Sequence, residues 1–127
     1  MHIQSTGPSF SRISETDVVA VFSNLLDNAI EAAEKSTEKV IFIDLYTVNN
    51  IYSIAKVENS ADKEPVVLNG ILQTQKQKYD IHGWGIKSIN NALKKYGSQL
   101  VWSYDKENKF FRTIVSVRVR STADKTV

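Results

Sequence analysis

One long amphipathic segment, residues 14–35, constrains the fold more than any other part of the chain. Ser14 is followed three residues later by Asp17, which is typical of a helix N-cap with an acidic first turn. Apolar residues then recur at helical spacing up to about Lys35, so the sequence predicts a helix here. Because this helix is apolar along one arc only, it must pack on another element. The predicted arc holds Val18, Phe22, Leu25, Leu26, Ala29, Ile30 and Ala33.

Two pairs of strand-like segments can supply that packing surface. Residues 39–45 and 51–57 are rich in β-branched and aromatic side chains and flank an Asn-Asn turn. Residues 99–104 and 110–120 flank a polar turn in the same way. Each pair is predicted to form a β-hairpin.

A second helix is predicted between the hairpins, with apolar residues at helical spacing from Ile86 to Tyr96 and Gly97 as its C-cap. Residues 60–81, which precede it, are mostly polar, so we expect a long loop that acts as a lid. The hairpins and helices do not alternate as in βαβ units. The sequence therefore predicts an α+β fold, with helices packed on one face of a mixed, largely antiparallel sheet.

Length and composition bound the number of domains and the classes of partner. A chain of 127 residues that is 42% hydrophobic suits one domain with one core, expected over residues 13–120. Residues 1–12 are expected to form an arm or edge strand anchored by Phe10, and residues 121–127 a frayed tail. The net charge of +2 gives no basis for binding nucleic acid.

The residue types that are scarce narrow the metal chemistry. With no cysteine and only two histidines, the chain cannot build a zinc site, so any metal must be held by oxygen ligands. The lack of cysteine also fits a reducing cytoplasmic setting. No apolar stretch approaches the roughly 20 residues that span a bilayer, so we expect the chain itself to be soluble.

The first candidate site is a polar stripe on the predicted helix 14–35. A rotation of about 100° per residue gathers Asn24, Asn28, Glu31 and Lys35 on one side. Asn is unfavourable in mid-helix because its amide competes with the backbone, so two of them one turn apart suggest a function. A neutral amide oxygen can complete the octahedral shell of Mg²⁺ without cancelling the charge that the ion offers to phosphates. The alternative is a core helix whose wet face is simply polar.

The second candidate site is the glycine-containing start of the second helix, His82-Gly83-Trp84-Gly85. Unhindered backbone N–H groups and the positive end of a helix dipole together favour phosphate binding. The motif is neither a Rossmann fingerprint, since Ser88 stands at the third glycine position, nor a Walker A loop. The alternative is that these glycines only end a loop and start a helix.

Three lysines are weaker candidates for contacts to phosphate. Lys76 and Lys78 belong to the predicted lid and Lys87 to the second helix, although isolated lysines are usually only solvated. His82 alone is more often a hydrogen-bonding loop residue than a catalyst.

Three motifs together resemble the nucleotide-binding boxes of the GHKL superfamily, which groups gyrase, Hsp90, histidine kinases and MutL. They are Asn24-x-x-x-Asn28-x-x-Glu31-Ala32, then Val57-Glu58-Asn59-Ser60, then His82-Gly83-x-Gly85-Ile86. The resemblance extends from about Ser14 to Arg120 and implies the two-layer α/β sandwich known as the Bergerat fold. Within the superfamily, the chain looks most similar to sensor kinases that read peptide pheromones in Gram-positive bacteria.

The resemblance implies a role for each matching residue. It makes Asn28 the Mg²⁺ ligand, Asn24 a contact to phosphate or water beside it, and Glu31 a helper in ordering the waters of the metal. Asn59 takes the adenine position, where most relatives have an Asp, and its amide oxygen can accept the same hydrogen bond. The glycine-box residues implied to approach the triphosphate are His82, Gly83, Gly85, Ile86 and Lys87.

The box around Asn59 departs from the usual pattern. Ser60, Ala61 and Asp62 replace the glycines that follow the adenine residue in most relatives. The resemblance therefore implies a looser base pocket and weaker ATP affinity than in those relatives.

The resemblance further implies the ATP-binding catalytic domain of a two-component sensor histidine kinase, with ATP and Mg²⁺ as ligands. Hydrolysing members of the superfamily place a glutamate one turn before the metal ligand. This chain has Asn24 there, and its amide cannot accept a proton at neutral pH, so the γ-phosphoryl group is kept for a histidine nucleophile. We expect that histidine in an upstream segment of the parent protein, so the fragment alone should be inactive.

The implied partners are the upstream phosphoacceptor and dimerisation helices of the parent kinase and a response regulator. The parent is expected to be a membrane-anchored homodimer, and this chain a monomeric cytoplasmic domain. Two alternatives stay open. One is a GHKL-type ATPase or gyrase-like clamp, and the other is a degenerate interaction module without nucleotide, suggested by the altered box around Asn59.

Overall fold

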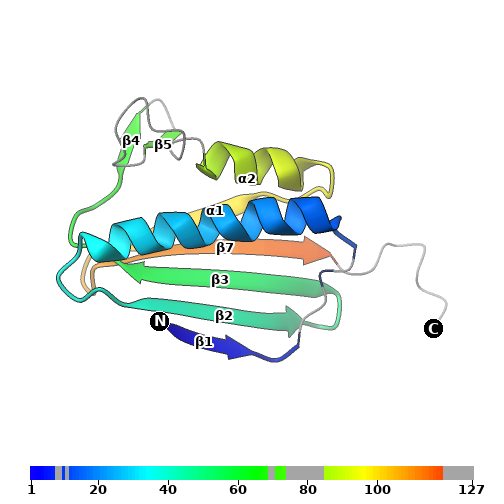
Figure 1. Cartoon of the computed structure of the whole chain (residues 1–127), viewed down its shortest axis with the longest axis horizontal. Helices are drawn as coiled ribbons and strands as arrows, with labels where there is room; N and C mark the ends of the chain where they lie inside the picture. The colour runs from blue at the N-terminus through cyan, green and yellow to red at the C-terminus, as the bar shows by residue number, and fades with distance from the viewer. Residues whose placement is uncertain (8–9, 11, 69–70, 74–84, 119–127) are drawn as a thin grey trace.

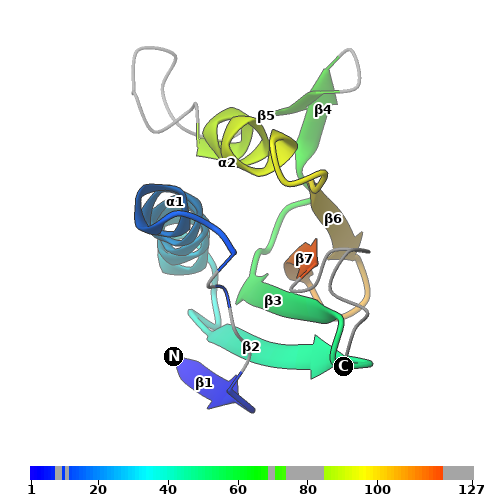
Figure 2. The ribbon, with the colours of Figure 1, turned by 90° about the vertical axis from the view of Figure 1, so that its right-hand side faces the viewer.

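The structure is a computed structural model that describes residues 1–7, 10, 12–68, 71–73 and 85–118. It has two layers, a five-stranded sheet and two helices that lie on the same face of it (Figures 1 and 2). A separate two-stranded sheet precedes the second helix. In chain order the elements are β1 (His2–Ser5), α1 (Glu15–Glu34), β2 (Ile41–Val48), β3 (Tyr52–Ser60), β4 (Val66–Leu68), β5 (Ile71–Gln73), α2 (Gly85–Lys94), β6 (Leu100–Asp105) and β7 (Phe110–Arg118).

The main sheet is mixed and has the strand order β1-β2-β3-β7-β6. β1 pairs with β2 in parallel, and the other neighbouring strands are antiparallel. The two hairpins expected from the sequence therefore join through β3 and β7, whose register places Asn59 opposite Phe111. The predicted α+β sandwich, with helices on one face of a largely antiparallel sheet, is confirmed.

The local sequence explains where α1 begins and ends. Ser14 is the N-cap, and its Oγ accepts a hydrogen bond from the backbone N–H of Asp17 at 3.2 Å. This bond satisfies one of the N–H groups that the first turn leaves without a helical partner. The helix ends at Glu34 with Lys35 as the C-cap, in agreement with the predicted segment.

α1 packs on β3 through a row of buried residues spaced by four. The row becomes small toward the end of the helix, running through Val21, Leu25, Ala29 and Ala33. Full burial of a side chain such as Leu25, which is 2% exposed, contributes about 1.5–3 kcal/mol to stability. Because alanine adds little bulk, the second half of α1 can approach the sheet closely.

The packed arc of α1 differs from the predicted one at two positions. Ile30 is 37% exposed, whereas Asp17 is buried. Helical rotation places Ile30 about 140° from Leu25, so its side chain turns away from the sheet. The polar stripe of α1 lies beside the packed arc and not on the fully exposed face of the helix. Asn24, Asn28 and Glu31 are half-buried along one flank of the helix.

The segments that connect the elements use the residues expected of tight turns. Asn49 and Asn50 take left-handed φ angles of 54° and 55° between β2 and β3. Gly97 takes a φ of 68° after α2, and the N–H of Ser98 reaches back to the Leu93 carbonyl at 3.2 Å. Glycine adopts this conformation without strain, so the predicted C-cap is confirmed.

The N-terminal segment contains the expected edge strand. β1 extends the sheet beyond β2, and Phe10 packs edge-on against Phe22 of α1 with ring centroids 5.4 Å apart. The predicted lid differs from expectation, because its segments Val66–Leu68 and Ile71–Gln73 pair as β4 and β5. No helix in the described part of the chain is long and apolar enough to cross a membrane.

Candidate functional site

The polar flank of α1 carries three of the predicted site residues. The Nδ2 of Asn24 donates to the Ala20 carbonyl at 2.7 Å, which holds the amide against its own helix. The Nδ2 of Asn28 and the Oε2 of Glu31 are both shielded from solvent. The three side chains therefore lie at the boundary between core and surface, where packing can fix the direction in which an amide oxygen points.

Asp17 lies on the same flank and ties it to α2. Helical rotation places Asp17 within about 20° of both Asn24 and Asn28. The Tyr96 hydroxyl donates to the Oδ2 of Asp17 at 2.6 Å, and the Nζ of Lys95 lies 2.8 Å from the same oxygen. Lys95, Tyr96 and the Ser14 hydroxyl, in that order, lower the pKa of Asp17 to about 2. The carboxylate thus stays ionised and fixes the end of α2 against the start of α1.

The antiparallel course of the two helices brings the start of α2 toward the asparagines. α2 packs against α1 and runs in the opposite direction (Figure 1). Gly85 precedes Tyr96 by eleven residues, and Asn28 follows Asp17 by the same number. At about 1.5 Å per helical residue, Gly85 comes roughly level with Asn28. The N–H groups of the first turn of α2, with the positive end of its dipole, therefore lie near the carboxamides.

Asn59 is buried at the end of β3, with 3% of its surface exposed. Its register partner in β2 is Ile41, a core residue, so the side chain lies on the helix-facing side of the sheet. The Nδ2 donates to the Ser60 carbonyl at 3.1 Å. This bond orients the amide group and leaves the carbonyl oxygen as its acceptor end.

Thr113 is a buried polar residue on the same face that sequence reasoning missed. It is 6% exposed and donates its hydroxyl hydrogen to the Val57 carbonyl at 3.3 Å. Val57 is two residues before Asn59 in β3. The Thr113 hydroxyl and the Asn59 carboxamide therefore lie on neighbouring strands, one two-residue strand repeat apart. The sequence signal for Thr113 is that a threonine interrupts an alternating apolar row, which contains Phe111, Val115 and Val117.

The three residues that follow Asn59 are each held by hydrogen bonds. The Ser60 Oγ accepts from the Val40 N–H at 2.9 Å and lies 2.6 Å from the Ser36 Oγ. The Ala61 carbonyl accepts from the Tyr104 hydroxyl at 2.7 Å. Burial there, with nearby Glu64 and Asp62, raises the pKa of Tyr104.

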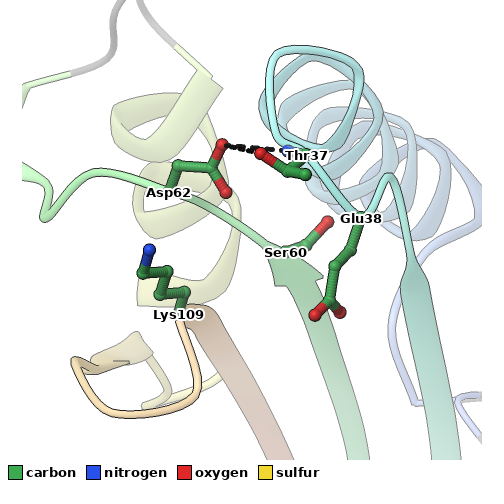
Figure 3. A pocket seen from close by; sticks show the side chains of 5 residues that line it. All are labelled: Thr37, Glu38, Ser60, Asp62 and Lys109. Atoms are coloured by element: carbon green, nitrogen blue, oxygen red, sulfur yellow. Dashed lines mark hydrogen bonds between the residues drawn. The ribbon is translucent and has the colours of Figure 1, made fainter.

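Asp62 completes this anchoring and borders a shallow pocket at the end of the sheet (Figure 3). Its Oδ2 accepts from the N–H and the hydroxyl of Thr37 at 2.9 and 2.8 Å. The described residues that line the pocket are Thr37, Glu38, Ser60, Asp62 and Lys109, and the predicted site residues are not among them.

The glycine-box residues are described only in part. Gly85 begins α2, Ile86 packs against the core, and Lys87 is exposed. His82, Gly83, Lys76 and Lys78 lie outside the described residues, so their predicted roles stay predictions.

The donor set on the α1 flank fits Mg²⁺ better than a cation that needs a full protein cage. In the described part of the chain no three His, Cys, Asp or Glu side chains come together to hold a metal. Mg²⁺ usually keeps several waters and takes only one or two protein ligands beside substrate phosphates. A single amide oxygen from Asn28, level with a helix N-terminus that attracts phosphate, meets that requirement.

Comparison with known proteins assigns the family. The sequence matches the family model described as the GHKL domain over residues 13–118. The chain therefore belongs to the GHKL family, as its three motifs suggest. No curated protein matches the chain by sequence.

Solved structures with a similar fold include several histidine kinases. The mycobacterial sensor histidine kinase MprB superposes with a TM-score of 0.68 at 12% identity, over 92% of this chain and 79% of that one. The Acinetobacter baumannii histidine kinase AdeS gives 0.65 at 14% identity, and the chain, 94% of which is covered, spans 54% of AdeS. The catalytic domain of the histidine kinase ThkA gives 0.57 at 16% identity, over 84% and 67%. The chain thus has the fold of histidine kinase catalytic domains.

Proposed function

We propose that the chain is the ATP-binding catalytic domain of a two-component sensor histidine kinase. The observation that carries the proposal is the position of Asn28. It shares one flank of α1 with Asp17, whose bond to Tyr96 brings Gly85 at the start of α2 level with Asn28. Membership of the GHKL family and the histidine kinase names of the structural neighbours support the same assignment.

The proposed site has a phosphate end and a base end. At the phosphate end, Asn28 contributes an amide oxygen to Mg²⁺, and Asn24 and Glu31 orient water or phosphate beside it. When bound, Mg²⁺ supplies positive charge that offsets the charge of the phosphates. At the base end, the Asn59 carbonyl oxygen accepts a hydrogen bond from the adenine amine. The other residues proposed to approach the triphosphate are His82, Gly83, Gly85, Ile86 and Lys87.

The chemistry proposed for this site is positioning rather than proton removal. Asn24 cannot serve as a base at neutral pH, so water in the site is not activated by it. Phosphoryl transfer through a loose transition state needs mainly alignment and charge neutralisation, which the α2 N-terminus and the amides supply. A neutral histidine nitrogen needs no deprotonation, which makes it a suitable acceptor.

The acceptor histidine is proposed to lie in an upstream dimerisation segment of a parent kinase, which passes the phosphoryl group to a response regulator. The parent is proposed to be a membrane-anchored homodimer with this domain in the cytoplasm. The chain spans about half of the AdeS chain, which leaves room in a kinase of that size for such segments.

The proposal is tested by calorimetric titration of the chain with a nonhydrolysable ATP analogue, with Mg²⁺ and then with EDTA. We expect saturable binding that Mg²⁺ strengthens. A longer protein that includes the upstream segment should then label itself with the γ-phosphoryl group of ATP in an acid-labile, histidine-type linkage. No binding of the analogue under either condition would support the interaction module instead.

A further inference from the structure

Two aromatic rings lie beside Asn59 on the helix-facing side of the sheet. Phe111 of β7 stands directly opposite Asn59 in the register. Trp102 of β6 stands opposite Thr113, and its ring centroid lies 5.6 Å from that of Phe111 with an angle of 34° between the planes. Directly opposite residues have Cβ atoms about 4.5–5.5 Å apart. The Phe111 and Asn59 side chains therefore start from neighbouring positions on this face of the sheet.

These rings are not fully covered, although they lie on the face that carries the helices. Phe111 and Trp102 are half-buried, whereas Asn59 and Thr113 beside them are 3% and 6% exposed. α1 packs mainly on β3, and α2 packs on β6. Accessible apolar surface beside a few oriented polar groups is typical of a site for a small molecule.

We propose that Phe111 and Trp102 form an aromatic wall against which the flat purine ring of the nucleotide lies, while Asn59 contacts the edge of the base. The inference rests on the proposed function and names two residues that determine affinity for the base. Aromatic rings can stack on the face of any base, whereas the Asn59 amide selects among bases by hydrogen bonding to the edge. Phe111 and Trp102 lie on other strands than Asn59, so substitutions can test the contact to the face of the base and the contact to its edge separately.

The first test compares two neighbouring phenylalanines. Phe110 lies on the same strand, directly before Phe111, but points to the opposite face of the sheet. There its ring centroid lies 6.0 Å from that of Phe42. With Mg²⁺ present, Phe111→Ala should weaken binding of the ATP analogue by roughly tenfold, within the range for loss of a base-stacking ring. Inorganic tripolyphosphate should bind Phe111→Ala as it binds the unchanged protein, and Phe110→Ala should alter neither ligand.

A second variant guards against simple loss of folding. Phe111→Leu keeps apolar bulk at the position but removes the flat ring, and it should also weaken the analogue without lowering the melting temperature greatly. If the unchanged protein, Phe111→Ala and Phe111→Leu bind the ATP analogue equally tightly, the proposed aromatic wall is wrong, whereas the proposed function is unaffected. Equal losses for the analogue and tripolyphosphate would overturn it too. Failure of the unchanged protein to bind any nucleotide would overturn both.

Tryptophan fluorescence gives an independent readout at the wall. The chain has two tryptophans, so Trp84→Phe leaves Trp102 as the only one. Saturating ADP should quench the emission of this variant, and tripolyphosphate should not, because only ADP carries a ring to stack. Emission unchanged by ADP at concentrations where calorimetry shows binding would place the base away from Trp102 and overturn its part in the wall.

Discussion

The hydroxyl of Tyr96, just beyond α2, donates a hydrogen bond to the Oδ2 of Asp17 in the first turn of α1 at 2.6 Å. The same hydroxyl accepts from the backbone N–H of Ser14 at 3.1 Å. One side chain thus joins the N-cap of α1 to the end of α2. Because the two helices run antiparallel, this junction sets how far along α1 the first turn of α2 lies.

Removal of the Tyr96 hydroxyl should loosen the two helices. We expect Tyr96→Phe to lower the melting temperature by roughly 5 °C, because a hydrogen bond to a carboxylate is lost. Thermal unfolding followed by circular dichroism measures the change. Tyr52→Phe, at a position 39% exposed on the sheet, is the control and should melt like the unchanged protein. Identical melting of the two variants would contradict the prediction.

The pH dependence of stability should report on Asp17. Its pKa in the folded protein is lowered from 3.8 to about 2, so its contribution is fully present above the unfolded value and is lost as the pH falls through about 2. Asp17→Asn should be less stable at neutral pH and lose less stability between roughly pH 4 and 2. Denaturant midpoints across that range test this, with Glu34→Gln at the exposed end of α1 as the control.

Asn28→Ala should abolish the Mg²⁺-dependent part of nucleotide binding and leave the protein folded. The expected loss of affinity for the ATP analogue is tenfold or more, on the order of 1.4 kcal/mol per tenfold. Calorimetry with and without Mg²⁺ measures it, and Ser23→Ala on the exposed face of α1 is the control. If Asn28→Ala instead unfolds the protein, the residue has a structural role.

ATP hydrolysis should be close to background, because Asn24 cannot accept a proton from water. Phosphate release by the unchanged chain and by Asn24→Ala should therefore be equally slow in a coupled assay. A steady release that Asn24→Ala removes would favour the GHKL-type ATPase.

Ser60→Ala should destabilise the end of β3 by about 1–3 kcal/mol, because the Val40 N–H and the Ser36 hydroxyl lose a buried partner. Urea unfolding provides the measurement. Ser103→Ala, exposed on β6, should change the free energy of unfolding by less than about 0.5 kcal/mol. Equal stability of the two variants would show that the Ser60 bonds contribute little.

Local patterns were sufficient for most of the elements. The helix from Ser14, the turn at Asn49 and Asn50 and the C-cap at Gly97 each depend on residues within a few positions, so the sequence predicts them correctly. The strand pair β4 and β5 was missed because each strand has only three residues, too few to show alternation.

The candidate site was predictable only where its residues are close in sequence. The spacing of Asn24 and Asn28 follows from helical rotation alone. Their approach to Gly85 depends on the bond between Asp17 and Tyr96, residues 79 positions apart, which no local pattern encodes. Phe111, which we propose contacts the base, was not a candidate because an aromatic residue on a strand looks like ordinary core until its exposure and register are known.

The alanines at the end of the buried row of α1 influence the distance between Asn28 on the helix and Asn59 on the sheet. Asn28 directly precedes Ala29 on the helix, while Asn59 belongs to the strand on which that helix rests, so the span between them depends on how closely the two layers approach. A bulkier side chain at Ala29 or Ala33 would raise the helix and stretch the span, although every polar group would survive. The distance between Asn28 and Asn59 that a bound molecule would have to span therefore depends on the small size of Ala29 and Ala33.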